Sequence, residues 1–118
     1  MDYSLLDEII IGRVEPHIYA FSTNTIPNYL KVGDTYRPVS VRLKEWEAYF
    51  PTLKKEFDAI AKIDDVYFRD FAVHKFLETE KSRIRLLLSD IPADVYYSKE
   101  FFKDASVEDL EEAIEDIK

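Results

Sequence analysis

The sequence predicts a single α+β domain, a fold class in which helices pack against an antiparallel sheet. Apolar and polar residues alternate in short segments, which is the period of a β-strand. In several other segments the apolar residues recur every three or four positions, which is the period of a helix. The chain has 118 residues, and 47% of them are hydrophobic, which suffices for one core without disulfides. We therefore expect one domain over residues 1–118.

Two of the strands are expected to form an antiparallel hairpin. Residues 17–22 and 29–33 carry the strand pattern, and the segment between them is polar and rich in turn formers. If the hairpin is centred near Thr25, Tyr19 lies opposite Lys31 and on the same face of the sheet. This register depends on the turn, because a slip of one residue would move one strand's side chains to the other face.

A third strand is expected where one apolar face alternates with polar residues. That face consists of Phe57, Ala59, Ala61 and Ile63. Before this strand, Pro38 suits the first turn of a helix that Pro51 ends. The apolar stripe of that helix consists of Val39, Leu43, Trp46 and Phe50.

Three further segments favour helices, and one stays open. Ser4 and Gly12 are expected to bound a short helix over residues 4–11. Asp65 is expected to cap a helix over about 66–78, which buries Phe68, Ala72 and Phe76 or their neighbours. Ser106 opens a segment that resembles a capping box, and the helix over about 107–117 buries Leu110, Ala113, Ile114 and Ile117. Residues 84–88 are apolar and fit either a strand or a helix.

The net charge of −8 argues against a generic nucleic-acid binder. The charge is unevenly placed, however. Residues 104–118 hold seven acids and one Lys, a net charge of −6, whereas residues 13–46 hold five basic and three acidic residues, a net charge of +2. The local balance removes much of the objection to DNA as a partner.

Several classes of protein are excluded or disfavoured. The chain has no Cys, which excludes a disulfide scaffold, a thiolate zinc site and a Cys nucleophile. No apolar run is long enough to span a membrane, and the acidic first segment lacks the features of a signal peptide. We expect a cytoplasmic domain that does not bind membranes and that forms the N-terminal part of a longer protein.

Five short motifs follow one another along the chain and are informative as an ordered set. They are Ile18-Tyr19, Leu30-Lys31-Val32-Gly33-Asp34-Thr35, Arg42-Leu43-Lys44, Ala72-Val73-His74-Lys75-Phe76 and Lys99-Glu100-Phe101-Phe102. Over about residues 17–102 the chain resembles the GIY-YIG nuclease superfamily, and more narrowly its phage T5-type branch, whose second motif reads Lys-Ile-Gly. The resemblance implies a three-stranded antiparallel sheet flanked by helices. It also implies hydrolysis of DNA phosphodiester bonds with one divalent metal ion, Mg²⁺ or Mn²⁺.

The resemblance assigns roles to five side chains. Glu100 matches the metal ligand, and a carboxylate suits a hard cation. Arg42 matches the arginine that binds a phosphate oxygen in the transition state. Tyr19 matches the tyrosine that positions or deprotonates the attacking water, and the charge of Lys31 beside it would assist. His74 completes the expected catalytic group, in contact with phosphate or orienting the site.

Four further residues are expected to support this site. Gly33 would let the backbone run close to a helix or to the phosphate. Lys81, Arg83 and Arg85 form a small basic run that would contact a DNA backbone, with a solvated loop as the alternative.

A second function stays open. The acidic balance and the absence of an identifiable counterpart of the family's late Asn ligand favour a catalytically inactive module that binds DNA or a protein. Such a module would belong to a larger restriction or helicase protein, and would deliver a neighbouring helicase, ATPase or restriction subunit to its target.

Overall fold

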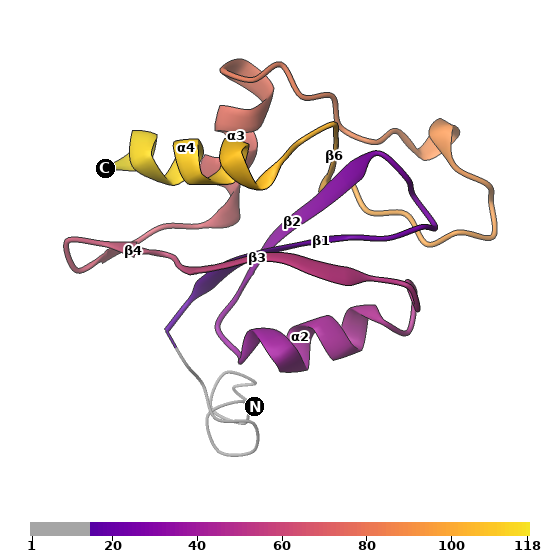
Figure 1. Ribbon diagram of the computed structural model, residues 1–118, viewed down its shortest axis with the longest axis horizontal. Coiled ribbons are helices and arrows are strands. Elements are labelled where there is room, and N and C mark those ends of the chain that lie inside the picture. Colours follow the sequence, from indigo (N-terminus) through magenta and orange to yellow (C-terminus); the bar gives the residue numbers. More distant parts are fainter. Residues whose placement is uncertain (1–14) are drawn as a thin grey trace, which may run out of the picture.

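A four-stranded antiparallel sheet with helices on both faces forms the centre of the molecule (Figure 1). The computed structural model describes residues 15–118, so the helix expected over residues 4–11 lies outside the described residues. The strands of the sheet are β1 (His17–Ser22), β2 (Tyr29–Thr35), β3 (Lys54–Ile60) and β6 (Phe101–Lys103), in the order β3-β1-β2-β6. A separate two-stranded hairpin consists of β4 (Lys62–Ile63) and β5 (Val66–Tyr67). The helices are α2 (Val39–Trp46), α3 (Asp70–Thr79), a 3₁₀ turn (Leu88–Asp90) and α4 (Val107–Ile117).

The α+β class is confirmed, but the main sheet has four strands and not three. The additional strand, β6, pairs antiparallel with the first half of β2, and its Phe101 and Phe102 are fully buried. It is only three residues long and stands between charged residues, so no alternating pattern marks it. The segment 84–88 touches this edge through a single bridge, Arg85 to Phe102. Its last residue, Leu88, begins the 3₁₀ turn, and residues 84–87 form neither a strand nor a helix.

The hairpin of β1 and β2 is confirmed, but its predicted register is wrong. Tyr19 pairs with Gly33, and Lys31 pairs with Phe21. The turn spans residues 23–28 as expected, but the hairpin is centred near Ile26 and not near Thr25. Ile26 is buried in the core, and Asn28 takes a φ of 69°. The shift is two residues, so Tyr19 and Lys31 still share one face of the sheet.

The predicted third strand is present as β3, but it ends at Ile60 and so excludes the expected Ala61 and Ile63. It begins at Lys54 and contains a bulge opposite the step from Ala20 to Phe21. Ile63 falls in β4, which belongs to the separate hairpin. The bulge shifts the alternation along β3, and Ala61 is fully buried just beyond its end.

The predicted cap of the second long helix is wrong. Asp65 lies in the turn between β4 and β5, where Asp64 and Asp65 have φ values of 50° and 66°. Two successive positive φ values are typical of a tight hairpin turn, which Asp tolerates. Helix α3 therefore starts later, at Asp70, and it buries Val73 and Leu77, the neighbours of the expected Ala72 and Phe76.

The other two helices are present at their predicted positions, with two differences. Helix α2 ends at Trp46, before the expected stop at Pro51, and in α4 Leu110 and Ala113 are buried whereas Ile114 and Ile117 are half-buried. Pro38 precedes the first residue of α2, and all four residues of the expected apolar stripe are buried. In α4 the Ser106 hydroxyl accepts a hydrogen bond from the Asp109 N–H at 3.3 Å. The Asp109 carboxylate accepts one from the Ser106 N–H at 3.1 Å, which completes the capping box.

The sheet separates two cores. Helix α2 covers one face, and α3 and α4 cover the other (Figure 1). The core under α2 is largely aromatic and includes Tyr19, Phe21, Trp46, Phe50 and Phe101. The core under α3 and α4 is largely aliphatic and includes Ile18, Val32 and Leu77. Within residues 15–118, no helix has the length and apolar character that crossing a membrane requires.

Candidate functional site

The candidate site is organised around a buried cation, Lys31. This residue lies on the α2 face of β2, and none of its surface is exposed. Its ammonium nitrogen lies 4.4 Å from the ring centre of Trp46 and 5.2 Å from that of Tyr19. Burying a cation is costly unless partners stabilise it, and aromatic faces supply part of that stabilisation.

The carboxylate of Glu100 supplies the rest. The Lys31 ammonium nitrogen lies 2.9 Å from Glu100 Oε1. Strand β6 pairs with the first three residues of β2, and beyond them the Val32 N–H donates to the Glu100 carbonyl at 3.0 Å. This bond holds Glu100, which directly precedes β6, beside β2, where its side chain meets the Lys31 ammonium. An ammonium has three N–H donors, so this one carboxylate oxygen leaves Lys31 with donors that no other described residue takes up.

Gly33 creates the space in which this pair forms. A Cβ at Gly33 would lie 2.8 Å from the Lys31 ammonium nitrogen and 2.9 Å from the Tyr19 hydroxyl oxygen. Both distances are shorter than normal van der Waals contact. The side chains of Lys31 and Tyr19 therefore cross directly over Gly33, which explains the glycine by space and not by an unusual backbone conformation.

The Tyr19 hydroxyl is held in the same core. It accepts a hydrogen bond from the indole N–H of Trp46 at 2.8 Å, and only 1% of the residue is exposed. The guanidinium carbon of Arg42 lies 4.9 Å from the centre of the Trp46 ring. The same guanidinium forms an ion pair with the Glu45 carboxylate at 3.1 Å. Lys31, Tyr19 and Arg42 thus all contact Trp46, and Arg42 is the one of the three that solvent reaches.

His74 reaches the site from the opposite face of the sheet. Its Nε2–H donates to the backbone carbonyl of Val32 at 2.8 Å, so Nδ1 keeps its lone pair. The ring packs against Phe102, with 5.1 Å between ring centres. Burial lowers the pKa of His74. The imidazole is therefore neutral at pH 7, which is the form that binds a metal.

Asp70 is a site residue that the sequence interpretation missed. It lies at the start of α3, one helical turn before His74. Burial raises the pKa of Asp70 to about 7, together with its hydrogen bond to Glu100 and the nearby charge of Asp34. Burial also acts to raise the pKa of Glu100, but the Lys31 ammonium outweighs it, and the pKa of Glu100 is lowered. The signal available in the sequence was the spacing of Asp70 and His74, which places both on one helix face.

These groups open onto a pocket of about 460 Å³ at the junction of α3 and β6. Its lining combines two acids, an imidazole, two cations and one aromatic ring: Asp70, Glu100, His74, Arg85, Lys99 and Phe71. Arg85 also donates to the backbone carbonyl of Lys99 at 3.1 Å and pairs with Glu78 at 3.0 Å. Of the three residues in the expected basic run, Arg85 is the one that lines this pocket.

The other two basic residues of that run face α4. Arg83 donates to Asp109 at 2.8 Å, and Lys81 forms an ion pair with Glu112. The acids of the C-terminal helix therefore neutralise Lys81 and Arg83. A DNA backbone would have to displace these acids to contact either residue.

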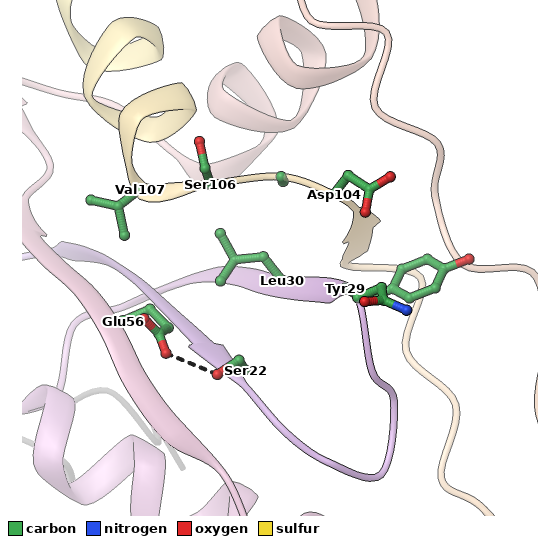
Figure 2. A pocket seen from close by; sticks show the side chains of 9 residues that line it. Ser22, Tyr29, Leu30, Glu56, Asp104, Ser106 and Val107 are labelled. Carbon is green, nitrogen blue, oxygen red and sulfur yellow. Dashed lines mark hydrogen bonds between the residues drawn. The ribbon is translucent and has the colours of Figure 1, made fainter.

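A second pocket, of about 400 Å³, lies near the start of α4 and has a different character (Figure 2). Figure 2 shows Ser22 donating to Glu56, with Asp104 and Ser106 on the segment that leads into α4. None of the nine residues that line this pocket is basic. The pocket beside Lys31 and Glu100 is therefore the better candidate for a phosphate-containing ligand.

The structure thus brings Tyr19, Lys31, Gly33, His74 and Glu100 together and joins Arg42 to them through Trp46. No protein-family model matches the chain, and no curated protein or solved structure matches it either.

Proposed function

We propose that this domain is a metal-dependent endonuclease that hydrolyses DNA phosphodiester bonds. One observation carries the proposal: the buried Lys31 ammonium meets Glu100 at the edge of a pocket that also holds Asp70 and His74. The proposal is supported by the resemblance to the GIY-YIG superfamily, because five residues that it singles out, far apart in the chain, lie together in space. The proposal includes binding to DNA and a cytoplasmic location.

The pocket has groups that suit a phosphodiester. Arg85 and Lys99 line it and would attract the anionic backbone. Lys31 has unused N–H donors beside Glu100, which a phosphate oxygen would accept as negative charge develops on it. Arg42 lies farther out, against Trp46, where it would bind a neighbouring phosphate.

Two further groups are placed to prepare the attacking water. Tyr19 is fixed by Trp46 and lies beside Lys31, a position from which its hydroxyl would orient water. Glu100 carries negative charge because its pKa is lowered, so it is available as a metal ligand at neutral pH. A divalent cation bound there supplies Lewis-acid stabilisation of the negative charge on the phosphate.

Cleavage of supercoiled plasmid in Mg²⁺ or Mn²⁺ tests the proposal. We expect nicking or linearisation by the parent chain, and a rate lower by at least about 10²-fold in Glu100→Gln, which keeps the shape but removes the charge. Glu111→Gln is the matched control, because Glu111 is an exposed acid on α4. Equal cleavage by the parent and by Glu100→Gln would contradict the assignment.

A catalytically inactive binding module is the second candidate, and a specific observation favours it. Tyr19 is 1% exposed and Lys31 is 0% exposed, so neither side chain is open to a substrate in this conformation. This candidate predicts salt-sensitive DNA binding in a gel-shift assay without cleavage, equal in the parent and in Glu100→Gln. The module would then serve a linked helicase, ATPase or restriction subunit.

A further inference from the structure

The two carboxylates and the imidazole at the mouth of the pocket form a compact set of possible metal ligands. A carboxylate oxygen of Asp70, one of Glu100 and a ring nitrogen of His74 all lie within 4.8 Å of one another. Asp70 and His74 are four residues apart on α3, so both side chains project from one face of the helix. Glu100 reaches the same point from the segment that precedes β6.

These separations are close to those of a bound metal. Two ligands on opposite sides of a divalent cation lie about 4.2 Å apart when each metal–ligand distance is about 2.1 Å. The observed 4.8 Å is an upper limit for the three atoms, so small side-chain movements would close the site. Helix α3 is anchored for this purpose, since Asp34 accepts hydrogen bonds from the Asp70 backbone N–H at 2.9 Å and from Arg69 at 2.7 Å.

The orientation of His74 agrees with a ligand role. Its Nε2–H is bonded to the Val32 carbonyl, which leaves the other ring nitrogen with its lone pair. Metal-binding histidines typically donate their second ring N–H to a backbone carbonyl or a carboxylate in this way, which fixes the tautomer and the ring plane.

A second and independent observation points to a ligand at this position. Lys31 is fully buried and meets one oxygen of Glu100, which leaves N–H donors that no other described residue takes up. These donors favour an anionic or polar group beside Glu100. A phosphate oxygen, or a water molecule bound to a cation, would accept hydrogen bonds from these donors. A solvated acidic surface would not place a buried ammonium beside the carboxylates.

We propose that Asp70, His74 and Glu100 together form a three-ligand site for a divalent cation that prefers Mn²⁺ to Mg²⁺. The inference deepens the proposed function and rests on its metal requirement, but it adds two ligands and a choice of metal. The preference follows from His74, because imidazole suits transition metals, whereas Mg²⁺ favours oxygen ligands and retained water.

Metal binding by the full chain, measured without DNA, tests this inference. Isothermal titration with Mn²⁺ and with Mg²⁺ compares the parent with Asp70→Asn, His74→Gln and the control Glu111→Gln. Losing a ligand should weaken Mn²⁺ binding by at least the roughly 10–100-fold that losing an outer-shell partner costs. His74→Gln should also reduce the preference for Mn²⁺ over Mg²⁺.

Pulsed electron paramagnetic resonance of bound Mn²⁺ tests the role of His74 directly. The parent should show nitrogen coupling that His74→Gln abolishes, and circular dichroism establishes that each variant is folded.

The outcomes separate the site from the activity. Weaker Mn²⁺ binding in folded Asp70→Asn and His74→Gln supports the site, even if the parent does not cleave DNA. Cleavage that depends on Glu100, with unchanged Mn²⁺ affinity in both other variants, overturns the three-ligand site and leaves the proposed nuclease intact. Absence of the nitrogen coupling in the parent, or equal affinity for Mg²⁺ and Mn²⁺, overturns the role of His74.

Discussion

At the residue scale, Lys31 shows how a charge is accommodated inside an aromatic core. Its ammonium lies over the rings of Trp46 and Tyr19 and meets Glu100 at the surface of the same core. Removing one partner of a buried pair costs more than the pair contributes, because the remaining charge stays desolvated. Glu100 therefore stabilises the buried Lys31 in addition to its proposed role in catalysis. Its variants must be tested for folding before activity is compared.

Gly33→Ala should destabilise the protein. Alanine normally gains about 0.5–1 kcal/mol over glycine in a strand through backbone entropy. Here the added methyl would lie 2.8 Å from the Lys31 nitrogen and 2.9 Å from the Tyr19 oxygen, and both groups are already held by Glu100 and Trp46. Overpacking of this kind costs about 1–3 kcal/mol, which exceeds the gain. Urea unfolding followed by circular dichroism measures the difference.

A double-mutant cycle with Lys31→Ala provides the control. Without the lysine side chain, the new methyl at Gly33 clashes with Tyr19 alone, so Gly33→Ala should cost less in that background. An unchanged or higher stability of the single Gly33→Ala variant would contradict the assigned packing.

At the element scale, α3 connects the candidate site to the aliphatic core. The inward stripe of the helix carries Asp70, Val73, His74 and Leu77 at helical spacing. Val73 and Leu77 enter the core, and Asp70 and His74 line the neighbouring pocket. Asp34 on β2 fixes the first turn of α3 through the Asp70 N–H. The register of β2 therefore decides where both possible metal ligands of α3 lie.

Ser106→Ala should lower the stability by about 1 kcal/mol, because it removes the hydroxyl that accepts a hydrogen bond from the Asp109 N–H at the start of α4. Ser106→Thr is the matched control, since threonine keeps the hydroxyl. Thermal and urea unfolding of both variants measures the effect. Equal losses in the two variants would show that the hydroxyl does not cap the helix.

At the scale of the whole molecule, the acidic C-terminal helix balances charges of the preceding segment. Asp109 and Glu112 on α4 pair with Arg83 and Lys81. Much of the net charge of −8 belongs to this helix, on the opposite face of the sheet from α2. Overall charge is therefore a weak guide to the candidate pocket, which Arg85 and Lys99 line.

The free energy of unfolding of the metal-free protein should fall between about pH 4 and pH 7 through Asp70. Its pKa is raised from 3.8 to about 7, so in this range the folded chain holds a proton that the unfolded chain releases. Solvent screening of the half-exposed carboxyl narrows this pH range, because it reduces the difference between the folded and unfolded pKa values. Burial lowers the pKa of His74, so that residue acts in the opposite direction as pH falls below about 6.5.

Comparison with Asp70→Asn isolates the effect of Asp70, because His74 is present in both proteins. In urea unfolding with a chelator, the variant should gain stability relative to the parent as pH rises from 4 to about 7. A stability difference that stays constant over this range would show that the Asp70 carboxyl does not hold its proton.

The local elements were predictable because their signals lie close together in the chain. The turn formers between residues 22 and 29 predict a hairpin, Pro38 predicts the start of α2, and Ser106 predicts the cap of α4. Short β6 and the late start of α3 were not predictable in this way. The first has only three residues, and the second depends on two aspartates that adopt positive φ in the β4–β5 turn.

Hydrophobic period and capping act over a few residues, so the α+β class, the hairpin and the apolar stripes of the helices could be predicted from the sequence. The pairing of Tyr19 with Gly33, the contact of Lys31 with Glu100 and the proximity of Asp70 to Glu100 follow only from the tertiary structure. Each of these depends on where an edge strand lies and on which residue a turn is centred. Such positions are set by packing between segments far apart in the chain, which no local pattern encodes.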